Sequence, residues 1–182
     1  MIDIDDIYTE IMKQNNTNAH WVDSPYLGFK VLPPKAKGAV GERMVREIFQ
    51  QKGCVIESPT SSDHDLIVDG RKKEIKMASL TRIEKCGNGN FTFFQVRPNQ
   101  DYDDLVLVCV HPDRIEVKEL SKDILKKFIV ENENEMVVAG GKEKRNRLKY
   151  AYGDNWMEHN DLYHWLHNTK ASYPEGTVSL ID

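Results

Sequence analysis

The stretch DLIVDGRKKEIK, residues 65–76, decides the fold, because it holds two short extended runs separated by a tight-turn dipeptide. Asp69-Gly70 between such runs is a strong signal for a two-residue β-hairpin loop. It predicts one strand over 64–68 and a return strand over 72–80.

This hairpin predicts that two carboxylates and an amine converge. With the loop at 69–70, Asp65 lies roughly opposite Glu74 on the return strand. Because successive side chains of a strand point to opposite faces, Glu74 and Lys76 share one face, and Ile75 and Met77 take the other. An Asp, a Glu and a Lys are thereby predicted to meet at one place.

Such a cluster suits the hydrolysis of a phosphodiester bond. Mg²⁺ prefers a few carboxylate oxygens and lowers the pKa of a bound water. Asp65 and Glu74 are predicted to supply those oxygens, and the backbone carbonyl of Ile75 is a further candidate ligand. Lys76 would orient or deprotonate the attacking water, or stabilise the charged phosphate. The alternative is a surface hairpin in which Glu74 and Lys76 form an ordinary ion pair.

The rest of the chain predicts an α/β fold (α+β), with a central mixed sheet flanked by helices. Apolar periodicity and turn residues predict helices over 2–14, 38–52, 121–130 and, as a short final helix, 159–167, with strands over 54–58, 104–110 and 114–120 and an extended or short helical piece over 91–96. We expect a single domain over 1–182 with a core at about 37–130. The N-terminal helix and residues 131–182 are expected additions for DNA recognition or dimerisation.

The motif S-x-x-D65-LIVDG-x-x-x-E74-I-K76 resembles the signature of the PD-(D/E)xK nuclease superfamily, the fold of type II restriction endonucleases. KGAVGERMVREIFQQKGC (37–54) and FTFFQVRPNQDYDDLVLVCVHPDRIEV (91–117) resemble the helix before and the strands after that motif. The resemblance implies a restriction-endonuclease-like core and Mg²⁺-dependent cleavage of double-stranded DNA, with Mn²⁺ as a substitute metal. His64 stands where the namesake proline would be, which is a departure from the pattern of the superfamily.

Two further residues are candidates for the same site. In the helix over 38–52, Glu42 and Glu47 lie equally far from the apolar centre, so periodicity does not choose between them. The resemblance to the G-E pair of the superfamily favours Glu42 as an accessory catalytic residue and metal ligand. Gln95, between aromatic residues, is a candidate to face the same cleft, and its alternative is a solvent-facing strand glutamine.

Basic and amide side chains supply candidates for DNA binding, although solvated helix faces are the commoner meaning of basic runs. The predicted DNA-binding residues are Lys35, Lys37, Arg71, Lys72, Gln95, Lys144, Arg145, Asn146 and Arg147.

Composition narrows the class of protein. The formal net charge of −4 counts against a passive DNA-coating protein, which is usually basic. Cys54, Cys86 and Cys109 have no paired spacing, so we expect a reducing, cytoplasmic setting. No apolar run approaches the roughly 18 residues of a membrane span, so no membrane association is expected. The histidines within 159–167 match no usual zinc spacing, and this counts against a zinc or HNH-type nuclease.

These features favour a type II restriction endonuclease. Cutting both strands of a palindromic site is simplest with two-fold symmetry, so a homodimer is expected. The alternatives are a Holliday-junction resolvase, a repair or phage-type nicking endonuclease, and a non-catalytic DNA-binding protein. A resolvase is expected to be smaller and more basic than this chain.

Overall fold

The computed structural model describes Ile4, Ile7 and residues 19–81, 89–132, 135–138, 141–152 and 162–181. Of the helix predicted over 2–14, only Ile4 and Ile7 are described, and both have helical backbone conformation. The described helices are η1 (Ala19–Trp21), α2 (Leu27–Lys30), α3 (Pro34–Gln51), α4 (Lys122–Glu131) and α5 (Gly141–Tyr152). None of the described helices combines the length and the apolarity needed to cross a bilayer.

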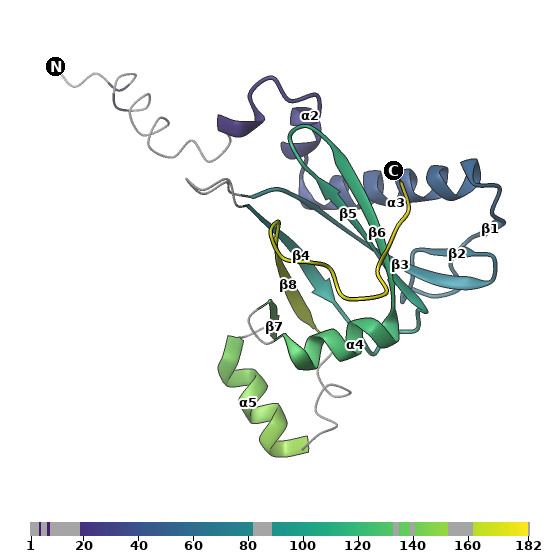
Figure 1. Ribbon diagram of the computed structural model, residues 1–182, viewed down its shortest axis with the longest axis vertical. Coiled ribbons are helices and arrows are strands. Elements are labelled where there is room, and N and C mark those ends of the chain that lie inside the picture. Colours follow the sequence, from purple (N-terminus) through teal and green to yellow (C-terminus); the bar gives the residue numbers. More distant parts are fainter. Residues whose placement is uncertain are drawn as a thin grey trace.

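A mixed six-stranded sheet forms the centre of the molecule, flanked by helices as predicted (Figure 1). Its strand order is β1 (Ile56–Glu57), β2 (Leu66–Val68), β3 (Arg71–Ser79), β5 (Asp104–Val110), β6 (Ile115–Ser121) and β9 (Val178–Ser179). Strands β3 and β5 are parallel, and every other neighbouring pair is antiparallel. The predicted fold class is therefore confirmed.

The predicted hairpin is formed by β2 and β3. Asp69 and Gly70 both have positive φ angles, of 48° and 78°, which is the backbone of a type I′ turn. Leu66 pairs with Lys73, and the backbone N–H of Asp65 donates to the carbonyl of Lys73 over 2.8 Å. The register therefore continues so that Asp65 reaches the level of Glu74, as predicted.

Strand β5 lies at the centre of the hydrophobic core. All seven of its residues are buried, as expected of a continuous apolar run covered on both faces. Cys109 belongs to this core, whereas Cys54 is only partly buried against it. Cys86 lies outside the described residues.

A second, three-stranded sheet has the order β4 (Asn90–Val96), β8 (Tyr163–Asn168) and β7 (Met136–Val138). The short helix predicted over 159–167 is wrong for the part described, because residues 163–168 form strand β8. Tyr163, Trp165 and His167 are buried and alternate with more exposed neighbours, which is the two-residue period of a strand. Pairing on both edges, with β4 and β7, stabilises the extended form. His159 lies outside the described residues.

Candidate active site at the β2–β3 hairpin

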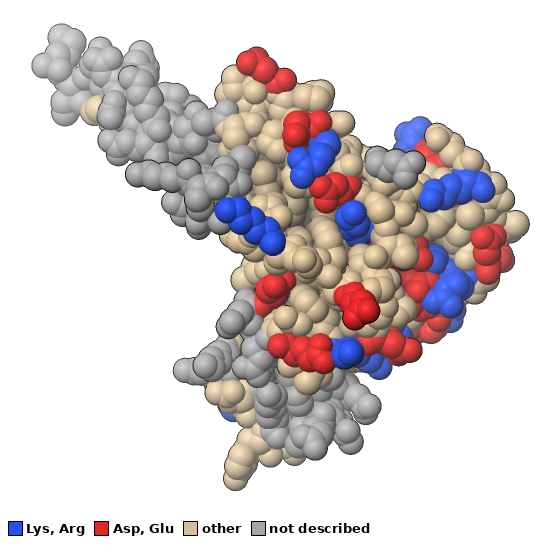
Figure 2. Space-filling view, viewed as in Figure 1, with Lys and Arg blue, Asp and Glu red and all other residues tan. Residues whose placement is uncertain are grey.

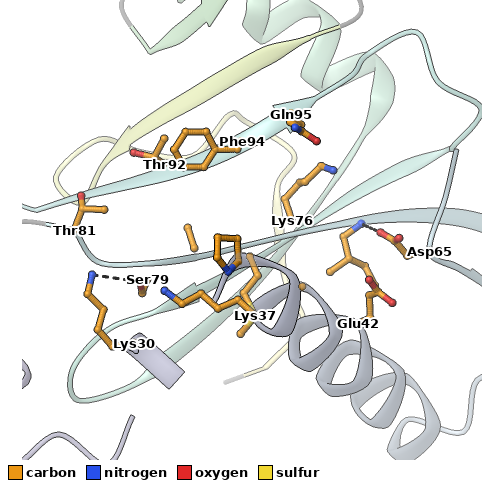
Figure 3. Close-up of a pocket in the computed structure, with 15 residues that line it drawn as sticks. Lys30, Lys37, Glu42, Asp65, Lys76, Ser79, Thr81, Thr92, Phe94 and Gln95 are labelled. Carbon is orange, nitrogen blue, oxygen red and sulfur yellow. Dashed lines mark hydrogen bonds between the residues drawn. The ribbon is translucent and has the colours of Figure 1, made fainter. Parts of the chain in front are cut away.

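A pocket of about 500 Å³ lies between α3, β3 and β4 (Figure 3). Residues from the start of α3, from β3 and from β4 supply most of its walls. The lining residues are Lys30, Pro34, Lys37, Gly38, Glu42, Asp65, Ile75, Lys76, Met77, Ala78, Ser79, Thr81, Thr92, Phe94 and Gln95.

Asp65 is held at one end of this pocket by the hairpin itself. Its carboxylate Oδ2 accepts a hydrogen bond of 2.7 Å from the backbone N–H of Ile75. The loop before it is fixed by His64, which is buried and bonded to Ser61 and to the carbonyl of Asp101. The side chain of His64 therefore anchors the loop by hydrogen bonds.

Glu74 and Lys76 form an ion pair, with 2.5 Å between Glu74 Oε1 and Lys76 Nζ. Lys76 reaches the pocket, whereas Glu74 is only 6% exposed and lies outside the pocket lining. Burial raises the pKa of Glu74 to about 7, with a further rise from Asp65 and an opposing effect of Lys76. A carboxyl with this pKa exchanges its proton near neutral pH.

Glu42 reaches the same end of the pocket from α3. The helix passes close to β3 at Gly41, where a side-chain Cβ would lie only 2.7 Å from Met77 Sδ and 3.1 Å from Met77 Cβ. Burial and the negative charge of Asp65 raise the pKa of Glu42. Glu47 instead lines a separate surface hollow elsewhere on α3. The structure therefore separates two glutamates that periodicity left equivalent.

The electrostatics of this end suit a cation. Asp65 raises the pKa of both Glu42 and Glu74, so its carboxylate repels each of the other two. Their hard oxygen atoms are the ligands that Mg²⁺ prefers. Among the described residues, however, no three acidic, histidine or cysteine side chains are gathered closely enough to hold one ion. Asp65 and Glu42 face the pocket, whereas Glu74 is turned to Lys76.

The other predicted site residues are spread over the molecule. Lys37 and Gln95 line the pocket, and Lys35 is exposed outside it. Arg71 is paired with Asp104, and Lys72 with Asp101.

Helix α5 carries the remaining DNA-binding candidates. It lies at the opposite end of the molecule from α3 (Figure 1). Its Lys144, Asn146 and Arg147 are exposed, and the side chain of Arg145 is outside the description. Over the described part of the face in Figure 2, acidic and basic side chains are interspersed, so this view gives no single-sign surface.

The sequence prediction missed Ser79, Thr81, Thr92 and Phe94 in the pocket wall. Two of them belong to β4, where the pairing with β8 shifts register between Phe93 and Val96. The sequence indicates this irregularity, because apolar and polar residues alternate from Phe91 to Phe93, but Phe94 then follows Phe93 directly.

Comparison with known proteins gives a partial structural likeness and no family. No protein-family model matches the chain, and no curated protein matches it. Among solved structures, the chain is similar to a bacterial homing endonuclease, I-Ssp6803I, with 17% sequence identity and a TM-score of 0.39. The match covers 51% of this chain and 72% of that one. A likeness of this size assigns no activity, so a function has to be argued from the site.

Proposed function

We propose that this protein is a metal-dependent endonuclease of the PD-(D/E)xK type that hydrolyses phosphodiester bonds of duplex DNA. One observation carries the proposal: Asp65, Glu42 and Lys76 face a single pocket, with Glu74 directly paired to the lysine. Two members of the sequence motif that suggested the chemistry, Asp65 and Lys76, thus line a pocket.

In this proposal Asp65 and Glu42 would hold Mg²⁺ together with the backbone carbonyl of Ile75, and deprotonated Glu74 would be a further ligand. The bound ion would lower the pKa of a water and stabilise negative charge on the phosphate. A proton on Glu74 competes with the metal, so binding should strengthen as the pH rises through about 7.

Lys76 is proposed to act on the phosphate or on the attacking water. Its ammonium group is held by Glu74 at 2.5 Å, which fixes where the positive charge lies. A fixed cation beside the pocket stabilises the charge that develops on a phosphate during hydrolysis. The pairing therefore gives Glu74 a second task, which is to position Lys76.

We further propose restriction-type cleavage of both strands by a homodimer. The support is the resemblance of the sequence to type II restriction endonucleases, together with the symmetry that cutting both strands favours. Resolvases and nicking endonucleases share the same proposed chemistry and differ in the DNA on which they act.

Digestion of a long natural duplex, with Mg²⁺ and with EDTA, tests the proposal. The protein is expected to cut DNA in Mg²⁺ and not in EDTA, and cleavage in Mg²⁺ should be lost in Lys76→Ala. Discrete bands would support a restriction enzyme, and a smear an unspecific nuclease. Cutting of four-way junctions alone would identify a resolvase, and relaxation of supercoiled plasmid without linear product a nicking enzyme. A protein that binds but cuts none of these substrates would overturn the nuclease proposal.

A further inference from the structure

The pocket has a second end, which carries positive charge. Lys30 and Lys37 line it together with the hydroxyl groups of Ser79, Thr81 and Thr92, away from Asp65 (Figure 3). The Lys30 ammonium lies 5.4 Å from the ring centroid of Trp21, and that of Lys37 lies 5.6 Å from that of Phe29. Each lysine ammonium thus makes a cation–π contact with an aromatic ring.

Lys30 is further fixed by hydrogen bonds. Its ammonium donates to the carbonyl of Leu80 over 3.0 Å and to Ser79 Oγ over 3.4 Å. These partners are neutral, so the positive charge is oriented without being cancelled.

The two lysines lack an acidic partner in the described part of the chain. No described carboxylate lies within 4.0 Å of either ammonium, whereas Lys73 and Lys76 on the neighbouring strand are both ion-paired. Burial and the charge of Lys37 lower the pKa of Lys30. Two like charges held together beside hydroxyl groups favour an anion with several oxygen atoms, such as a phosphate.

The facing wall offers an aromatic surface. Phe94 is 61% exposed, although it lies in a strand whose other phenylalanines are buried. The irregularity of β4 turns it outward, since Gln95 has a positive φ of 59° and its N–H donates to His164 Nδ1 over 3.4 Å. The ring of Phe94 rests edge-on against His164, with centroids 5.1 Å apart. An exposed ring beside an anion site suits the flat face of a nucleotide base.

The two ends of the pocket are separate sites. Lys76 and Ser79 are three residues apart on β3, which corresponds to roughly 10 Å along a strand. One phosphate group cannot reach both ends over that distance. The positive end therefore requires a different phosphate from the one that meets Asp65 and Lys76.

We propose that the positive end binds a nucleotide flanking the scissile bond, with its phosphate at Lys30 and Lys37 and its base, turned out of the duplex stack, against Phe94. This inference rests on the proposed nuclease function and adds a substrate-positioning subsite to it. The subsite would set the register of the DNA relative to the carboxylates.

The test measures binding of a fluorescent DNA duplex by anisotropy over a range of salt concentrations. All proteins carry Lys76→Ala, so that cleavage does not interfere. Adding K30Q and K37Q should weaken binding about tenfold at low salt. It should also reduce the slope of log affinity against log salt by about 1, the effect of one lost phosphate contact. K126Q with K127Q, which removes two exposed lysines of α4, is the matched control and should change neither quantity.

Phe94→Ala tests the base contact independently of the two lysines. Because the ring is exposed, its removal should leave the fold intact. About tenfold weaker binding with an unchanged salt slope is expected. If wild-type protein cuts DNA but both sets of variants bind like the control, the subsite is refuted and the nuclease proposal stands. If wild-type protein cuts no DNA and Lys76→Ala protein does not bind it, both proposals fall.

Discussion

Strand β3 contributes to two clusters of charged side chains, one closed and one open, which meet at the adjacent residues Lys73 and Glu74. The closed cluster consists of Arg71, Lys73, Asp104 and Glu119. Lys73 Nζ lies 2.7 Å from Asp104 Oδ2 and 3.1 Å from Glu119 Oε1, and Arg71 binds both oxygens of Asp104. Two cations and two carboxylates balance, and Lys73 and Asp104 are buried.

The open cluster consists of Glu42, Asp65, Glu74 and Lys76. It has one ion pair, between Glu74 and Lys76, and two further carboxylates that face the pocket. Arg46 lowers the pKa of Glu42 and Arg97 lowers that of Glu74, but each has a smaller effect than burial and the other members of the cluster.

The difference between the clusters separates structural charge from functional charge. In the closed cluster each buried charge is neutralised within the protein, so its effect should be on stability. In the open cluster, the excess of negative charge is not neutralised by the described residues, and under the proposed function its effect should be on activity. Exchanging or removing single members of each cluster tests this division.

The largest effect is expected from Asp65→Ala or Lys76→Ala. Each removes a group that faces the pocket, and DNA cleavage should fall by about 10³-fold or more, on the scale of losing a main electrostatic contributor. The free energy of unfolding in urea should change by less than in the Asp104 variant below, because Asp65 and Lys76 are only partly buried and Glu74, whose pKa is raised to about 7, can take up a proton. Lys126→Ala is the matched control and should retain wild-type cleavage. Wild-type cleavage in either site variant would refute the assignment.

The next largest effect is expected from Asp104→Ala in the closed cluster. The substitution leaves the buried Lys73 and the adjoining Arg71 without their shared carboxylate, and should lower the free energy of unfolding by about 3–5 kcal/mol. Asp113→Ala, which removes an exposed ion pair with Arg114, should cost less than about 1 kcal/mol. Equal urea midpoints for the two variants would contradict a structural role of the closed cluster.

A smaller effect, dependent on pH, is expected from Glu74→Gln. The pKa of Glu74 is raised from its ordinary 4.5 to about 7 in the folded protein. Between these values the folded state retains a proton that the unfolded chain releases, so wild-type stability falls as the pH rises. Glutamine does not titrate. The variant should therefore gain stability relative to wild type as the pH rises from 4.5 to 8, by about 3 kcal/mol. A stability difference that stays constant over this range would show that Glu74 titrates normally.

The smallest effect is expected from Glu42→Gln, compared with Glu47→Gln. Only Glu42 reaches the pocket, so cleavage at limiting Mg²⁺ should fall about tenfold in the first variant, as for an accessory metal ligand. The second variant should cleave DNA like wild type. Equal rates for both would remove Glu42 from the site.

Local signals predicted the hairpin and its register well. Asp69-Gly70 fixes both the turn and the register, because two consecutive positive φ angles suit this dipeptide. From that register the proximity of Asp65 to the strand of Glu74 and Lys76 follows. The continuous apolar run 104–110 likewise predicted a strand buried on both faces, which β5 confirms.

Features that depend on distant contacts were not predictable from one sequence. Strand β8 was mistaken for a helix because its short apolar pattern fits both periods, and only pairing with β4 and β7 decides between them. The choice of Glu42 over Glu47 depends on the side of α3 that meets β3. The positive end of the pocket joins α2 and the start of α3 to the end of β3 and to β4, which lie much later in the sequence.

The most direct test is a titration of the protein with Mn²⁺ at pH 8, in which binding is measured as the loss of the electron paramagnetic resonance signal of free Mn²⁺. Wild-type protein and Glu47→Gln should both bind the ion saturably. Asp65→Asn removes one charge from the open cluster and keeps the size of the side chain. This variant should bind Mn²⁺ at least tenfold more weakly. Absence of saturable binding in wild type, or equal binding in Asp65→Asn, would contradict the claim that the open cluster is a metal-dependent active site.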